Sequence, residues 1–222
     1  MRKACVGAAL TCAALFGVAA CGGSGSSTTA TFKPEGSLPS QAPAAAASRA
    51  SGAPGSNSVI MPPFGKNVHM VMTNWLPSNA GEAQAVLTDK NYELAYLYAE
   101  YTGGVNQDWT AYVSPAMQTE VQQALSQPDV TTESFTGTIR FFDMTVLQDP
   151  TVPADLDVSA CFDNAQSSNT SLHTGKVIPG NQPADQHYYR YTDQLAKDSS
   201  GAWKVVAVLP PVYYPRAKEC KP

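Results

Sequence analysis

Hydrophobic and polar residues follow three different patterns along this chain of 222 residues. An uncharged apolar run comes first, and a stretch dominated by Gly, Ser, Thr, Ala and Pro comes second. In the remainder, apolar residues recur first with a helical period and then with the period of strands. Helices followed by strands are typical of an α+β domain. The pattern therefore predicts three segments: residues 1–20, residues 21–58, and a single domain over 59–222.

The strongest helical pattern covers residues 80–102. Asn79 stands three residues before Glu82, which predicts an N-cap with a capping-box partner. The pair Gly103-Gly104 is expected to end the helix. Spacings of three and four place one apolar stripe along it, made of Ala83, Val86, Leu87, Leu94, Leu97, Tyr98 and Tyr101.

Two shorter elements flank this helix. Residues 68–75 are apolar enough to form an entry strand or an extended segment. Ser114-Pro115 predicts an N-cap followed by Pro at the first helical position. Met117, Val121 and Leu125 continue at i, i+4 and i+8, and Gln127-Pro128-Asp129 is expected to stop this second helix.

Strand patterns fill the C-terminal half. In 156–162, Leu156, Val158, Ala160 and Phe162 share one face. Residues 164–185 are polar and predict a loop or an irregular ribbon. The predicted strands are 135–147, 156–162, 187–197 and 203–209, with a turn at 198–201 between the last two. We expect N-terminal helices packed on a curved antiparallel sheet.

The apolar run at the N-terminus predicts where the protein resides. Arg2 and Lys3 precede it, and the small residues of 18–20 close it. This arrangement is typical of a secretory signal peptide. Cys21 directly follows, which resembles the lipobox of bacterial lipoproteins, in which that cysteine is diacylated and becomes the mature N-terminus. The resemblance implies a lipid-anchored protein on the extracytoplasmic face of the bacterial cell membrane.

Two alternatives to lipidation stay open. The run of 4–20 has 17 residues, against about 20 for a membrane-spanning helix, and basic residues do not follow it. Ordinary cleavage after Ala20 would release a soluble protein with three cysteines. Lipidation of Cys21 instead leaves one even pair, Cys161 and Cys220, for which we predict a structural disulfide.

The amino-acid composition limits which molecules the protein is expected to bind. Residues 22–58 carry only three charged residues and one aromatic residue, so they cannot bury enough apolar surface to offset their ordering entropy. We expect a flexible tether there. Without the signal peptide the chain has 12 basic and 18 acidic residues, a net charge of −6. This balance argues against nucleic-acid binding and against a polybasic membrane patch; the expected membrane contact is the lipid anchor.

Two stretches carry a wider resemblance. They are VSACFDN at 158–164 and DQLAKDSSGAWKVVAVLP at 193–210. With the lipobox and the tether, they resemble small secreted lipoproteins of high-GC Gram-positive bacteria. Over residues 66–210 the chain is similar to the cone-shaped domains of ketosteroid isomerase and nuclear transport factor two. The resemblance implies a bent sheet that wraps helices around a pocket.

Such pockets use an Asp as general base and a Tyr as donor to an oxyanion. Acidic and tyrosine residues also lie on the predicted strands of this chain or directly beside them, namely Asp143, Asp157, Asp163, Tyr188, Tyr189 and Tyr191. They do not match the isomerase pattern residue by residue, so no catalytic residue is carried over. The candidate pocket residues are Tyr98, Asp157, Tyr189 and Tyr191.

No cofactor or metal site is predicted. His69, His173 and His187 lack metal-ligand spacing, and no phosphate-binding glycine loop follows a strand. The sequence favours a non-catalytic domain that binds a small apolar ligand or an envelope protein. The alternatives are an isomerase or dehydratase that uses the same pocket, and a structural accessory subunit of a cell-wall or transport complex.

Overall fold

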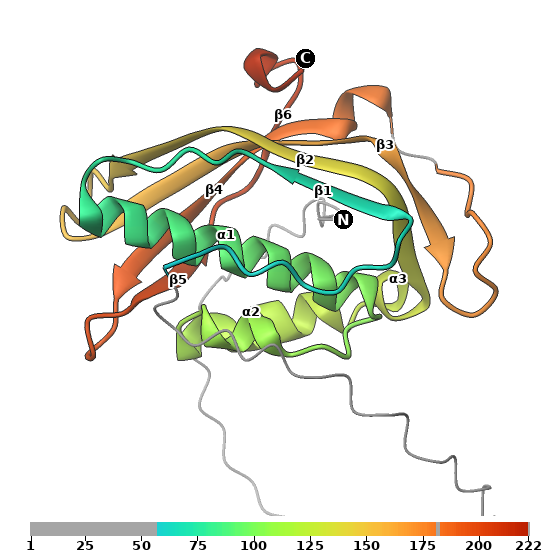
Figure 1. The fold of residues 1–222 in the computed structure, drawn as a ribbon, viewed down its shortest axis with the longest axis horizontal. Coiled ribbons are helices and arrows are strands. Elements are labelled where there is room, and N and C mark those ends of the chain that lie inside the picture. Colours follow the sequence, from blue (N-terminus) through green and yellow to red (C-terminus); the bar gives the residue numbers. More distant parts are fainter. Residues whose placement is uncertain (1–56, 181–182, 222) are drawn as a thin grey trace, which may run out of the picture. The chain divides into compact units, whose positions relative to one another are not determined.

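The computed structural model describes residues 57–180 and 183–221. The expected signal peptide, Cys21 and nearly all of the expected tether lie outside these residues. The described part is an α+β fold in which a curved sheet of six strands carries three α-helices on its concave side (Figure 1). The predicted α+β class is confirmed.

The sheet is mixed, with strand order β1-β2-β3-β4-β5 and with β6 paired to β4. β1 runs parallel to β2, and the other pairs are antiparallel. A purely antiparallel sheet was therefore the wrong expectation. The helices form a crossover between β1 and β2, which returns the chain in the same direction. The strands are β1 (Val68–Met72), β2 (Glu133–Gln148), β3 (Leu156–Ser171), β4 (Tyr188–Lys197), β5 (Trp203–Val208) and β6 (Val212–Tyr213).

Both long helices begin at their predicted caps. Asn79 Oδ1 accepts hydrogen bonds from the backbone N–H groups of Gly81 and Glu82 at 2.8 and 3.1 Å. Ser114 Oγ accepts from the N–H of Met117 at 3.4 Å. A third helix was not predicted, because Pro128 starts a new turn as its first residue instead of only ending the previous one. The helices are α1 (Ala80–Tyr101), α2 (Pro115–Leu125) and α3 (Pro128–Thr132).

β3 continues well past its predicted end. The polar residues 164–171 were expected in a loop, but the stretch from Gln166 to Ser171 pairs with the first part of β2. Backbone pairing needs no apolar side chains, so a long partner strand holds this polar segment in the sheet. Gly137 lies in the paired region with φ +98°, where an added Cβ would approach the Gln166 carbonyl oxygen to 2.1 Å.

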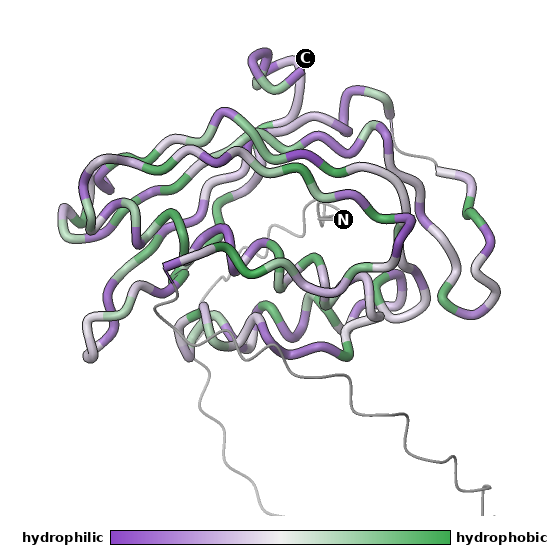
Figure 2. The backbone as a smooth tube through the Cα atoms, viewed as in Figure 1, coloured by the Kyte–Doolittle hydropathy of each residue, from purple (hydrophilic) through white to green (hydrophobic). Residues whose placement is uncertain are grey.

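The core lies between the concave face of the sheet and the helices. Apolar and polar residues alternate along much of the sheet in Figure 2, and the buried apolar residues of the strands face inward. The Phe162 and Tyr189 rings stack at 4.7 Å, and Phe141 meets Phe162 edge-on at 5.1 Å. All three side chains belong to the buried core, together with residues of α1 and α2.

The opposite face of the sheet holds the C-terminal segment. Cys161 on β3 and Cys220 form a disulfide that links residues 59 apart, as predicted. Arg190 on β4 forms ion pairs with Glu219 and Asp143 beside it. The end of the described chain is thus attached to the convex face.

Candidate functional site

Helix α1 buries polar residues as well as its predicted apolar stripe. Asp89, Lys90 and Glu93 have exposed fractions of 0%, 1% and 3%. Because four residues complete about one helical turn, Asp89 and Glu93 lie one above the other on the same face. The apolar stripe predicted the helix but not this second buried face.

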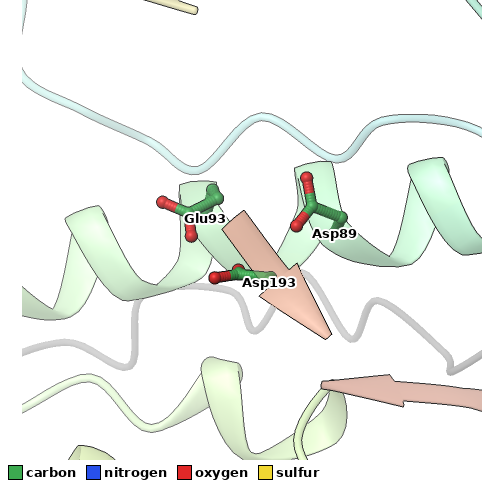
Figure 3. Close-up of side chains that lie close together, drawn as sticks. All are labelled: Asp89, Glu93 and Asp193. Atoms are coloured by element: carbon green, nitrogen blue, oxygen red, sulfur yellow. The ribbon is translucent and has the colours of Figure 1, made fainter. Parts of the chain in front are cut away.

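β4 brings a third carboxylate to that face. Tyr189, Tyr191, Asp193 and Leu195 alternate with outward residues and are all buried. Figure 3 shows the side chains of Asp89 and Glu93 from α1 and Asp193 from β4 gathered together. One carboxylate oxygen from each lies within 4.8 Å of the others. We call Asp89, Glu93 and Asp193 the carboxylate cluster.

The cluster is electrostatically unfavourable when every member is ionised. Burial raises the pKa of Asp89 well above its usual range, and the nearby charges of Asp193 and Glu93 raise it further. A hydrogen bond from the Tyr191 hydroxyl to Asp89 Oδ2, 3.2 Å long, acts in the opposite direction. No described protein donor reaches Asp89 Oδ1, so a proton shared with Asp193 or a bound cation would stabilise that oxygen.

The nearby ammonium group of Lys90 is directed elsewhere. Its Nζ donates to the carbonyl oxygens of Thr73 and Trp75 at 2.8 and 2.9 Å. Burial lowers the pKa of Lys90, and the charge of Asp89 partly offsets this. Lys90 therefore ties the segment before α1 to the helix, while the carboxylates face β4.

Chemically, the cluster suits a proton or a cation. Carboxylate oxygens are the ligands that hard cations such as Ca²⁺ and Mg²⁺ prefer. Asp89, Glu93 and Asp193 are the residues that could hold such an ion or an organic ammonium group. The available sequence signal was a pair of acids at i, i+4 in the middle of the predicted helix, together with Asp193 in phase with Tyr191.

The structure brings together only part of the predicted pocket. Tyr191 contacts the cluster, and Tyr189 lies on the same face of β4. Asp157 pairs with Gln194, so it points to the convex face, because neighbouring strand residues alternate sides. Tyr98 lies farther along α1, with its ring stacked on that of Tyr101 at 6.1 Å.

The other acids and histidines considered from sequence lie away from the cluster. Asp143 and Asp163 pair with Arg190 and Arg140. His187 Nδ1 lies 2.9 Å from Asn164 Oδ1, and His69 and His173 are exposed. The described residues thus leave the carboxylate cluster as the strongest candidate site.

Comparison with known proteins does not assign a function. No protein-family model matches the chain, and no curated protein sequence matches it. Within the described residues, no helix has both the length and the apolar composition needed to cross a membrane.

Proposed function

We propose that this protein is a lipid-anchored extracytoplasmic domain that binds a small positively charged ligand between α1 and β4. The carboxylate cluster is the observation that carries the proposal. Three buried carboxylates in one place have a high energetic cost, and a cation placed among them lowers that cost. The domain acts by binding and needs no catalytic step.

The anchoring part of the proposal rests on the sequence. Arg2, Lys3 and the apolar run precede Cys21, and a segment of tether composition follows. The Cys161–Cys220 disulfide supports an oxidising compartment outside the cytoplasm. The cone-type domain implied by the resemblance stays part of the proposal, and a curved sheet with helices on its concave side is compatible with it.

The cluster favours a cationic ligand over an apolar one. Asp89, Glu93 and Asp193 are already buried, and an apolar group placed between them would offer no charge or hydrogen bond to offset that burial. Because their oxygens lie within 4.8 Å of one another, a single metal ion or ammonium group can contact all three. The Tyr191 ring supplies an apolar wall beside them.

Isothermal titration of the full chain in detergent tests this proposal. The probes are CaCl2, MgCl2, MnCl2 and spermidine, each titrated at pH 7. We expect at least one probe to bind saturably, and the double variant Asp89→Asn/Asp193→Asn to weaken that binding at least tenfold. Glu82→Gln, in the first turn of the same helix, is the matched control. Absence of binding for all four probes, or equal binding by the double variant, would contradict the proposal.

One observation favours an enzyme as the second candidate. A raised pKa keeps a proton near Asp89 beside the Tyr191 hydroxyl, and such a pair can donate hydrogen bonds to a developing oxyanion. An isomerase or dehydratase would exchange a carbon-bound proton of its substrate with solvent. Incubation in D2O of the small molecules that copurify with the protein tests this. Carbon-bound deuterium that is lost with Asp89→Asn would favour the enzyme.

A further inference from the structure

An open groove of about 530 Å³ runs between the 3-10 helix Asp108–Ala111 and α2. The carboxylate cluster takes no part in its lining. Its volume lies in the range of about 300–1,000 Å³ that is usual for small-molecule sites. Seven of its eight lining side chains are amides or hydroxyls, and they include Gln107, Thr110, Gln118, Gln122, Gln123 and Ser126.

The helical period of α2 explains this lining. Met117, Val121 and Leu125 face the core and are buried. The next row along the helix, Gln118, Gln122 and Ser126, therefore lies beside them and faces the groove. Glu120 is the single charged residue in α2 and does not line the groove. The result is an uncharged surface in which amide and hydroxyl groups stand at the ends of apolar side-chain stems.

Internal hydrogen bonds orient three of the amides. The Nε2 groups of Gln107, Gln118 and Gln122 donate to Gly104 O, Thr110 O and Ser126 Oγ at 3.2, 3.5 and 3.3 Å. One N–H of each NH2 group is thereby engaged, and the described residues offer no donor to their Oε1 atoms. These oxygens form a set of oriented acceptors.

The rest of the lining supplies donors and a rigid base. Thr119 and Gln123 are exposed, and their side chains make no hydrogen bond within the described part of the chain. Trp109 also lines the groove and is only 1% exposed, so its ring is held by the core. The groove therefore combines fixed acceptors with available donors on a firm support.

We infer that this groove binds a neutral, polyhydroxylated ligand of the oligosaccharide class. Each sugar hydroxyl both donates and accepts hydrogen bonds, which matches a lining of oriented amide oxygens and available hydroxyl and amide donors. The groove offers no Lys or Arg for a phosphate or a carboxylate, and no carboxylate for a metal ion. The grooves that accept amphipathic helices are lined by apolar side chains, whereas seven of the eight residues here carry an amide or a hydroxyl group.

NMR titration of the full chain in detergent tests the inference, because glutamine side-chain amides give their own signals. The probes are chitotetraose and maltotetraose. We expect at least one probe to shift the amide signals of Gln118, Gln122 and Gln123 saturably. In Gln118→Met/Gln122→Met the affinity should fall at least tenfold, since methionine keeps the length and the helix propensity of glutamine but removes the amide.

Gln186→Met, an exposed glutamine outside the groove, is the matched control and should bind like the wild type. The inference is overturned if neither sugar shifts these signals, or if the double variant binds as tightly as the wild type. Loss of sugar binding in Asp89→Asn with retention in the double variant would also overturn it, because it would place the sugar at the carboxylate cluster. Failure of cation binding leaves this test unaffected.

Discussion

The hydroxyl of Tyr191 donates a hydrogen bond to Oδ2 of Asp89, 3.2 Å away and 102 residues earlier in the chain. This bond joins β4 to α1 inside the core. The acceptor is the carboxyl group of Asp89, whose pKa is raised by burial and by the nearby charges of Asp193 and Glu93. The contact between helix and sheet is therefore sensitive to pH.

The free energy of unfolding should fall as pH rises above about 4. The pKa of Asp89 is raised in the folded protein, so the folded state binds its proton more tightly than the unfolded state does. The resulting stabilisation is fully present below the ordinary value of 3.8 and is lost as pH rises through the raised pKa. Each unit of the raised pKa corresponds to about 1.4 kcal/mol. Urea unfolding from pH 4 to 8 measures this slope.

Asp89→Asn should flatten that slope, while Glu82→Gln should leave it unchanged. The lowered pKa values of Asp149 and Asp198 act in the opposite direction, since their stabilisation is lost only as pH falls below about 4. The chosen pH window therefore separates their effect from that of Asp89. An unaltered slope in Asp89→Asn would show that the pH dependence has another source.

Lys90→Met should lower the free energy of unfolding by about 1–3 kcal/mol, the usual cost of acceptors that lose their partner. The carbonyl oxygens of Thr73 and Trp75 both depend on the Lys90 ammonium group. Hydrogen exchange around residues 73–76 should become faster. Lys176→Met, at an exposed position, is the control. Equal stability of both variants would mean that the Lys90 contacts contribute nothing.

Replacement of both disulfide cysteines, Cys161→Ser/Cys220→Ser, should destabilise the protein by about 4 kcal/mol. In the chain-entropy model, closing a loop of this length restricts the unfolded chain by that amount. Urea unfolding with and without reductant measures the loss, and carboxypeptidase digestion reports release of the C-terminal segment. Two thiols that label without reductant in the native protein would refute the disulfide.

Gly137→Ala should destabilise the protein by about 2–3 kcal/mol. The backbone at this position has φ +98°, and a methyl group would meet the carbonyl oxygen of Gln166. Thermal unfolding compares it with Gly180→Ala, where an added Cβ meets nothing within 4 Å. If the two variants unfold at the same temperature, the close approach between β2 and β3 is incorrect.

Cys21→Ser should move the protein out of the membrane fraction and abolish its labelling by an alkyne-tagged fatty acid. The expected anchor is attached to this one sulfur, so no acyl chain remains to hold the protein. Cell fractionation and in-gel fluorescence provide the measurement, and Cys12→Ser, inside the expected signal peptide, is the control. Persistent labelling of Cys21→Ser would exclude this residue as the lipidated one.

The positions that the sequence predicted well depend on near neighbours. Asn79 caps α1 through N–H groups two and three residues away, and the turn at Asp198 closes through Ser200 and Ala202. The Cys161–Cys220 pair was predicted because lipidation of Cys21 leaves only these two cysteines. The caps and turns are predicted from a few neighbouring residues, and the disulfide is predicted from the number of cysteines.

The candidate site was largely missed for the opposite reason. Tyr191 was selected for its place in a tyrosine-rich strand, but Asp157 proved to lie on the other face of the sheet. Asp89 and Glu93 were not singled out, because the sequence pattern selected only the apolar positions of their helix. Nothing local distinguishes a helix face that meets water from one that meets another strand.

The sequence by itself determined where the two long helices begin and end, how most strands alternate, and which cysteines pair in the domain. Only the tertiary structure decided that β1 runs parallel to β2, that β3 extends through a polar segment, and that Asp193 meets Asp89 and Glu93. The first set depends on backbone preferences and side-chain period over a few residues. The second depends on which surfaces pack together, and that is settled by the free energy of the whole core.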